Sequence, residues 1–410
     1  MKQTIKCLFA AFAAMLMSVA AFAQVTTSAL GGRVVDANGE PVIGVAVIAT
    51  HTPSGTVYGV TTNEAGRYTI NGMRSGGPYS VEFTCLGYQT VTYTDLTLQL
   101  AETSSLNATL NEDSEMLSEA KVIGAAASKF SAGKTGAATN ISCSQITSLP
   151  TVNRSINDVT RLSPYGGNGM SFAGSDGRTA NFTVDGANFN NNFGLNDGLP
   201  GGGNPISIDA IEELQVVISP YDVRQTNFIG GGVNAITKSG TNTFKGSAYI
   251  YHRNENMRGN TVAGAEISGA RDRDRNTSYG FTLGGPIIKN KLFFFVNAEY
   301  SQTPSVAVRW RASENGVGNS DKYLAYTSVE DMERVKDHVM TKYGYDTGSY
   351  TDFPADESNV KLLARLDWNI NDAHKLALRY NYTNNTGWNG PNASSMDGGT
   401  RSAYARTSLY

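Results

Sequence analysis

Residues 206–254 decide the fold, and they read ISIDAIEELQVVISPYDVRQTNFIGGGVNAITKSGTNTFKGSAYIYHRN. The first part predicts a short helix that begins at Asp209, with Glu212 and Glu213 in its first turn, where negative charge suits the positive helix end. A strand over 214–218, a run of three glycines and a long alternating strand follow. The stretch therefore joins a compact α/β unit to the first strand of a larger β structure.

Downstream of this stretch, apolar and polar residues alternate over long strands. Over 361–369, one face carries Leu362, Ala364, Leu366 and Trp368, and the other carries Lys361, Arg365, Asp367 and Asn369. Residues 374–382 repeat the pattern, and 291–300 form another strand. Runs of about ten residues with aromatic ends suit tilted strands that cross a bilayer, with the apolar face toward lipid and the polar face toward a lumen.

Two smaller modules precede these strands. Residues 28–111 contain short strands separated by Gly and Asn turns, which predicts a β-sandwich. Residues 128–239 combine a short amphipathic helix over 151–161, a strand over 181–185 and a Gly/Asn-rich loop over 187–203. This second module is expected to be a small α/β domain.

The start of the chain predicts export. Residues 1–23 have a basic beginning, an apolar run over 8–21 and a small-x-small cleavage site at 21–23. Cys85 and Cys143 remain in the mature chain, and we expect them to be unpaired because they fall in different modules. The formal net charge of −3 gives no signature of nucleic-acid binding.

Several strings resemble a known family. IDAIEELQVVISPYD, GGGVNAITKSGTN and GGPIIKN occur in this order, and they resemble the TonB-dependent outer-membrane receptors of the Oar-like group. Residues 28–111, with GGRVVDANGEPVIGVAV, TNEAGRYTI and YSVEFTCLGY, look like the carboxypeptidase-regulatory-like domain. That name carries no enzymatic content for this chain.

The resemblance implies a mainly β fold in five segments. These are a signal peptide (1–23), the carboxypeptidase-regulatory-like β-sandwich (28–111), a linker (112–127), a small α/β plug domain (128–239) and the N-terminal part of a transmembrane antiparallel β-barrel (240–410). About seven strands fit in the last segment, whereas a barrel wide enough to hold a plug has about 22. We therefore expect this chain to be an N-terminal fragment of a larger receptor.

The linker carries a candidate contact for TonB. A short apolar stretch lies between small residues and comprises Glu119, Ala120, Lys121, Val122 and Ile123. In the family, such a segment serves as the TonB box, which adds as a strand to the edge of a partner sheet. The alternative, with equal weight, is that this stretch forms the first strand of the plug.

The resemblance also implies two groups of site residues in the plug. Candidate ligand-binding residues at the plug apex are Phe189, Asn190, Asn191, Asn192 and Phe193, which offer ring stacking and amide hydrogen bonds; the alternative is a loop packed against the barrel wall. Candidate residues for a charge lock between plug and barrel are Arg178, Asp185 and Glu212, and such pairs can also be purely structural.

The sequence offers no convincing catalytic, metal or cofactor site. His252 and Glu255 have HxxE spacing but lack a clear third ligand. Residues 128–135 end in GKT but begin with Ser128 where a P-loop requires Gly. We expect no enzyme activity and no cofactor.

The leading hypothesis from the sequence is a TonB-dependent transporter in the outer membrane. It would move a large nutrient, an oligosaccharide or a peptide, with energy that TonB receives from ExbB and ExbD, and its sandwich would lie in the periplasm. Outer-membrane lipid and a surface lipoprotein are the other expected partners. The alternatives are a surface adhesin or an outer-membrane protein associated with protein secretion.

Overall fold

The computed structural model forms two compact units. It describes residues 26–112, 121–124, 137–151, 154–190, 199, 204–220, 225–257, 259–266, 275–304, 311–348, 356–371 and 374–386, so the predicted signal segment 1–23 lies outside the described residues. The first unit comprises Met1–Lys245, Leu283–Val296 and Ala364–Arg379, and the second comprises Gly246–Thr282, Asn297–Leu363 and Tyr380–Tyr410.

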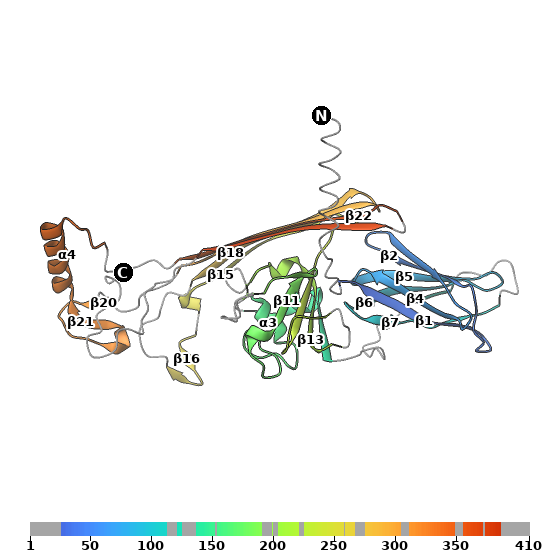
Figure 1. The fold of residues 1–410 in the computed structure, drawn as a ribbon, viewed down its shortest axis with the longest axis horizontal. Coiled ribbons are helices and arrows are strands. Elements are labelled where there is room, and N and C mark those ends of the chain that lie inside the picture. The colour runs from blue at the N-terminus through green and yellow to red at the C-terminus, as the bar shows by residue number, and fades with distance from the viewer. Residues whose placement is uncertain are drawn as a thin grey trace, which may run out of the picture. The chain divides into compact units, whose positions relative to one another are not determined.

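A β-sandwich opens the described chain and is drawn in blue in Figure 1. Its strands are β1 (Ser28–Asp36), β2 (Ala46–His51), β3 (Thr56–Thr61), β4 (Arg67–Met73), β5 (Gly76–Thr84), β6 (Val91–Leu98), β7 (Thr103–Ser105), β8 (Ala108–Leu110) and β9 (Lys121–Gly124). One sheet has the order β4-β1-β7 with β8 also on β1, and the other has the order β3-β2-β5-β6-β9. Strand β5 shows why they pack: Tyr79, Val81 and Phe83 alternate inward and are at most 1% exposed.

A five-stranded sheet follows, which we call the central body together with its helices. Its order is β10-β13-β14-β11-β12, and its elements are β10 (Ala137–Ser142), α2 (Cys143–Ser148), α3 (Ile156–Thr160), η1 (Gly177–Thr179), β11 (Asn181–Val184), β12 (Ala187–Asn188), η2 (Ile208–Ala210), β13 (Ile211–Ser219) and β14 (Gly232–Thr237). The helix α2 begins with a capping box between Ser142 and Gln145.

The predicted helix at Asp209 is wrong. Only the 3-10 turn η2 forms there, and Glu212 and Glu213 lie on strand β13. This strand runs between β10 and β14, and Leu214, Val216 and Val217 are buried in it. Burial of consecutive residues on both faces, typical of a central strand, outweighs the helix-start signal of the acidic residues.

The long strands form a second five-stranded sheet, which we call the long sheet. Its order is β15-β18-β19-β22-β23, and its strands are β15 (Lys245–Arg253), β18 (Asn276–Ile288), β19 (Leu292–Thr303), β22 (Glu357–Asn369) and β23 (Lys375–Thr386). The smaller elements are η3 (Glu255–Met257), β16 (Thr261–Val262), β17 (Ala265–Glu266), β20 (Arg311–Ser313), η4 (Ser320–Lys322), β21 (Leu324–Ser328) and α4 (Val329–Tyr343).

Burial on β22 is inverted relative to a water-soluble sheet. Leu362 and Trp368 are 42% and 41% exposed, whereas Lys361 and Arg365 are each 6% exposed. The predicted division of this strand into an apolar and a polar face is confirmed. An apolar face left outward with charges packed inward is the pattern of a strand whose outer surface meets lipid.

In the second unit, the inward face of the long sheet carries a buried polar network. Glu299 on β19 accepts a hydrogen bond from Tyr249 Oη at 2.9 Å and another from Lys361 Nζ at 2.7 Å. Charges buried in this way must be paired, because an unpaired charge away from water is strongly unfavourable. Among the helices in the described ranges, none has both the length and the apolar character needed to cross a bilayer.

We expect Leu362→Arg to impair membrane insertion. An arginine on the lipid-facing side of a barrel strand destabilises it by about 2–4 kcal/mol near the bilayer midplane. The matched control is Ala377→Arg on the neighbouring strand β23. It adds the same side chain to the polar face of the sheet, which is the face opposite to that of Leu362. The heat-modifiable folded fraction in outer-membrane preparations checks the expectation, and equal losses in both variants would contradict it.

Candidate functional site

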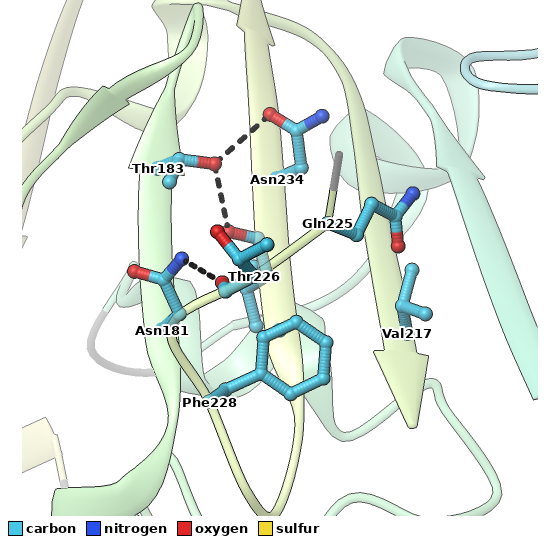
Figure 2. Close-up of a pocket in the computed structure, with 9 residues that line it drawn as sticks. Asn181, Thr183, Val217, Gln225, Thr226, Phe228 and Asn234 are labelled. Carbon is cyan, nitrogen blue, oxygen red and sulfur yellow. Dashed lines mark hydrogen bonds between the residues drawn. The ribbon is translucent and has the colours of Figure 1, made fainter. Parts of the chain in front are cut away.

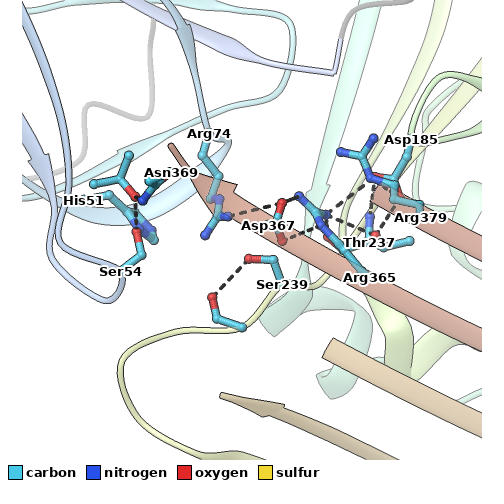
Figure 3. Close-up of polar contacts among 12 residues, drawn as sticks. His51, Ser54, Arg74, Asp185, Thr237, Ser239, Arg365, Asp367, Asn369 and Arg379 are labelled. Carbon is cyan, nitrogen blue, oxygen red and sulfur yellow. Dashed lines mark hydrogen bonds and ion pairs between the residues drawn. The ribbon is translucent and has the colours of Figure 1, made fainter. Parts of the chain in front are cut away.

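A buried arginine of the long sheet contacts the central body within the first unit. Arg365 on β22 donates through Nε and Nη2 to Asp367 Oδ2 and Oδ1, at 2.8 and 3.0 Å. Its Nη1 donates to the carbonyl oxygen and the hydroxyl of Thr237 at the end of β14, at 2.6 and 3.1 Å (Figure 3). All five donors of a guanidinium lie in one plane, so this side chain bridges two sheets in a fixed orientation.

Asp185 completes the contact from the other side. It lies in the turn after β11 with φ +50°, and its side chain is 4% exposed. Its carboxylate accepts hydrogen bonds from the backbone nitrogen of Thr237 at 3.0 Å and from its hydroxyl at 2.5 Å. Two arginines of the long sheet pair with it, Arg365 at 3.7 Å and Arg379 at 3.2 Å.

The sandwich adds a fifth charge. Arg74 Nη2 lies 3.6 Å from Asp367 Oδ1 (Figure 3). We call Arg74, Asp185, Thr237, Arg365, Asp367 and Arg379 the charge cluster. Its three arginines face two carboxylates, and Glu212 is close enough to act on Arg365 electrostatically. The cluster thus joins the sandwich, the central body and the strands β22 and β23.

The three predicted lock residues have different surroundings. Asp185 pairs with arginines of the long sheet, while Arg178 forms a partly exposed pair with Asp176 two residues earlier. Glu212 lies half-buried on β13, with its carboxylate beside Gly76. A role of these residues as a lock stays a prediction. Sequence reasoning did not assign Arg74, Arg365, Asp367 or Arg379, although two of them stand on the polar face of 361–369.

We expect Asp185→Asn to loosen the central body. The amide keeps an acceptor for the backbone of Thr237 but leaves Arg365 and Arg379 with less negative charge, and breaking a buried pair destabilises by about 3–5 kcal/mol. The matched control, Asp176→Asn, removes an exposed pair with Arg178, and exposed pairs contribute little to stability. The urea concentration at which trypsin begins to cleave the central body should fall for the first variant only.

A second buried contact joins the sandwich to the central body. The carbonyl oxygen of Leu100 accepts hydrogen bonds from Asn140 Nδ2 at 3.1 Å and Gln215 Nε2 at 2.9 Å. Its backbone nitrogen donates to Glu213 Oε1 at 2.9 Å. Glu213 is 5% exposed, and its burial raises the pKa of the carboxyl to about 7. The backbone of one sandwich residue is therefore held by three side chains of the central body.

This contact should weaken as the pH rises through about 7. The native state keeps the Glu213 proton to a higher pH than the unfolded chain does, so the stabilisation is complete below 4.5 and is lost above the raised pKa of about 7. A pKa rise of this size corresponds to roughly 3 kcal/mol. Hydrogen exchange at the Leu100 amide, corrected for the intrinsic rate, should therefore accelerate across this range. Glu213→Gln should abolish the dependence, and Glu212→Gln should retain most of it.

The predicted apex residues fall partly within the described chain. Asn190 Oδ1 accepts from the backbone of Phe182, and its Nδ2 donates to Asn181 Oδ1, both at 2.6 Å. The backbone nitrogen of Phe189 donates to the carbonyl of Phe182. The side-chain amide of Asn190 thus bonds to the first two residues of β11. Asn191, Asn192 and Phe193 lie outside the described residues, and ligand binding by any of the five stays a prediction.

A small cavity lies inside the central body (Figure 2). Its lining includes Asn181, Thr183, Gln225 and Phe228. Its volume is about 20 Å³, counted as the space open to the centre of a water molecule. This is enough for about one water molecule and too small for a nutrient. Asn181 Nδ2 donates to the carbonyl of Thr226, and Thr183 Oγ1 donates to Asn234 Oδ1, so the cavity is part of the packing of this sheet.

The candidate TonB contact belongs to the sandwich and not to the sheet of the central body. Residues Lys121–Gly124 form β9, which pairs in parallel with β6, whereas the central sheet begins with β10. The alternative that this stretch is the first strand of the plug is therefore wrong. Glu119 and Ala120 lie outside the described residues.

One pair of side chains has the residue types of a nucleophile and a base. His51 Nδ1 and Ser54 Oγ lie 2.6 Å apart, and Ser54 contacts Thr56 at 2.7 Å. Ser54 is fully buried, and burial together with Arg74 lowers the pKa of His51 to about 3. The neutral imidazole and the inaccessible hydroxyl form an internal hydrogen-bond chain that ends at Asn369 Nδ2 on β22, 3.0 Å from Thr56.

The other sequence motifs show no ligand set. His252 Nδ1 lies 2.8 Å from Thr277 Oγ1. Within the ranges that the structure describes, no three side chains of His, Cys, Asp or Glu are grouped closely enough to hold a metal ion. Cys85 and Cys143 are free thiols, and residues 128–135 lie outside the described chain.

Comparisons with known proteins agree with this architecture. Residues 29–111 match the model of the carboxypeptidase regulatory-like domain, and residues 236–310 match that of an outer membrane β-barrel domain. Over 394 residues the chain is 26% identical to the TonB-dependent transporter Oar from Myxococcus xanthus, which covers 90% of this chain and 34% of the relative. The chain thus spans about a third of the length of that curated relative.

Solved structures of outer-membrane receptors are also similar. The siderophore receptor PirA from Acinetobacter baumannii matches with a TM-score of 0.39 and 19% identity over 60% of this chain and 31% of that chain. The outer membrane transporter YddB from Escherichia coli matches with a TM-score of 0.40 and 14% identity over 61% and 33% of the two chains. The chain is a homologue of a TonB-dependent transporter, with a carboxypeptidase regulatory-like domain ahead of an outer-membrane β-barrel domain.

Proposed function

We propose that the protein is a TonB-dependent outer-membrane transporter that imports a large nutrient, an oligosaccharide or a peptide. The observation that supports this most is the charge cluster. Asp185 and Thr237 of the central body contact Arg365 on the polar face of β22. A compact body seated on the inward face of membrane-spanning strands is the arrangement of a plug in a barrel.

The inward charges of β22 hold the proposed plug against the long sheet. Arg365 and Asp367 face the central body, while Leu366 between them on β22 is 40% exposed on the opposite side. In the proposed transporter, outer-membrane lipid covers that apolar side, and the barrel is large enough to enclose the plug. The charge cluster holds the plug in the closed state and must loosen when the plug moves.

The proposed cycle begins with ligand binding at the outer side of the plug. The loop over 187–203, with Phe189 to Phe193, supplies aromatic rings and amides that suit sugar or peptide groups. TonB, driven by ExbB and ExbD, then binds the segment Glu119–Ile123 in the periplasm by strand addition. The pull rearranges the plug, and the nutrient passes. A surface lipoprotein that delivers the nutrient is a further proposed partner.

Deletion of residues 119–124 tests this function. Cells that express the gene are grown on maltoheptaose or on casein peptides as the sole carbon source, with and without a protonophore. The control replaces the six neighbouring residues 113–118 by Gly and Ser, which keeps the wild-type length of the linker. Uptake of one nutrient should depend on the proton gradient and vanish only in the deletion, at unchanged surface level.

One result would count against import, and another against the proposed place of TonB contact. If neither nutrient depends on the gene while adhesion or protein secretion does, the alternative outer-membrane functions replace it. If the deletion imports as well as the control, TonB acts elsewhere on the chain. Either result is independent of how well the variants fold, since surface level is measured in the same cells.

A further inference from the structure

The strand β9 lies at the edge of a sandwich sheet. Its four residues run parallel to β6, with Val91, Thr92, Tyr93 and Thr94 opposite Lys121, Val122, Ile123 and Gly124. An extended segment that pairs with the edge of a sheet is bound by strand addition. Here the chain supplies both the edge and the segment, and the segment includes three of the residues proposed to contact TonB.

The opposite edge of the same sheet is fastened to the long sheet. The sheet order is β3-β2-β5-β6-β9, so β3 and β9 are its two edges. Asn369 on β22 donates to Thr56 at 3.0 Å, and Lys375 Nζ on β23 donates to the carbonyl of Val57 at 3.3 Å. The same ammonium lies 3.3 Å from the centroid of the Tyr58 ring, a cation–π contact.

A third fastening comes from the connection between the central body and the long sheet. The backbone nitrogen of Asn242 donates to the carbonyl of Pro53 at 2.8 Å. Gly55 in the same sandwich turn lies against the side chain of Asn290, and a Cβ at Gly55 would be 2.3 Å from its oxygen. The turn between β2 and β3 therefore fits closely against residues beside β15 and β18.

We propose that the sandwich sheet is a catch for the TonB-contact segment. Its β3 edge is fixed to the strands of the long sheet, and its β6 edge holds β9. A pull on Lys121–Gly124 is therefore borne by the sandwich until β9 leaves β6, and only then does it reach the central body. This inference rests on the proposed function, because it takes TonB as the source of the pull.

The connection to the central body begins directly after β9. Twelve residues separate Gly124 from Ala137, the first residue of β10, and such a length of chain extends to at most ~45 Å. While β9 stays paired, this connection carries no load from the segment. Pairing also covers the β6 edge, which would otherwise be an open template for strands of other proteins.

A reversible cross-link tests the catch. Thr92→Cys and Val122→Cys are combined in a chain in which Cys85 and Cys143 are replaced by Ala. The matched control pairs Val122→Cys with Glu82→Cys, because Glu82 is opposite Thr92 on β5 and thus one strand further from β9. Both pairs are expressed in cells, oxidised, and assayed for the disulfide and for growth on maltoheptaose or casein peptides, with and without dithiothreitol.

We expect the first pair to cross-link at least about tenfold more than the control. Oxidation should abolish nutrient-dependent growth with the first pair only, and dithiothreitol should restore it. The catch is overturned if the two pairs cross-link equally, or if the locked protein imports as well as the reduced one. If reduced and wild-type proteins import neither nutrient, the proposed function fails instead, whatever the cross-link shows.

Discussion

The buried guanidinium of Arg365 is the constraint on which the rest of the first unit depends. A charge that is 6% exposed must be neutralised and hydrogen-bonded where it lies. Asp367 on its own strand, and Asp185 and Thr237 of the central body, do so together. Because these partners come from separate elements, the position of one side chain fixes a strand of the long sheet against the end of two strands of the central sheet.

The same interaction is part of the inverted burial of β22. Arg365 finds its inward partners in Asp185 and Thr237 of the central body, and Lys361 finds its partner in Glu299 of β19. The residues left on the outside are Leu362, Leu366 and Trp368. In water, that outward face would favour association with other apolar surfaces. In a bilayer this apolar face would contact lipid, which suits it. The inward ion pairs and the outward apolar residues therefore fit a single arrangement of the strand, with its polar face toward protein and its apolar face toward lipid.

The sequence predicts those features that depend on local periodicity, as β22 shows. The alternation of its residues is sufficient to identify both faces of the strand. The error at Glu212 and Glu213 arises because a helix-start signal is local, whereas the neighbours β10 and β14 that make β13 a central strand come from distant parts of the chain. The partners of Asp185 escape sequence reasoning for the same reason: Arg365 and Arg379 lie almost two hundred residues away.

The candidate site shows the same limit more sharply. The apolar stretch at 121–124 is recognisable as a strand, but nothing in its residues tells which sheet it joins. Parallel pairing with β6 depends on an edge that exists only once the sandwich has folded. Likewise, the raised pKa of Glu213 follows from burial of its carboxyl, and that burial depends on a fold in which residue 213 lies against Leu100, which is 113 residues away in the sequence.

The position of β10 determines how the central body would come apart. Within the described chain it is an edge strand that pairs with β13, from Ala137 opposite Ser219 to Ser142 opposite Glu213. A tension that arrives through residue 136 acts on the first of these pairs, so the pairs of β10 with β13 would break one after another. Peeling needs far less force than shearing all pairs at once. The last pair in that sequence contains Glu213, so the peeling front ends where the central body holds the sandwich.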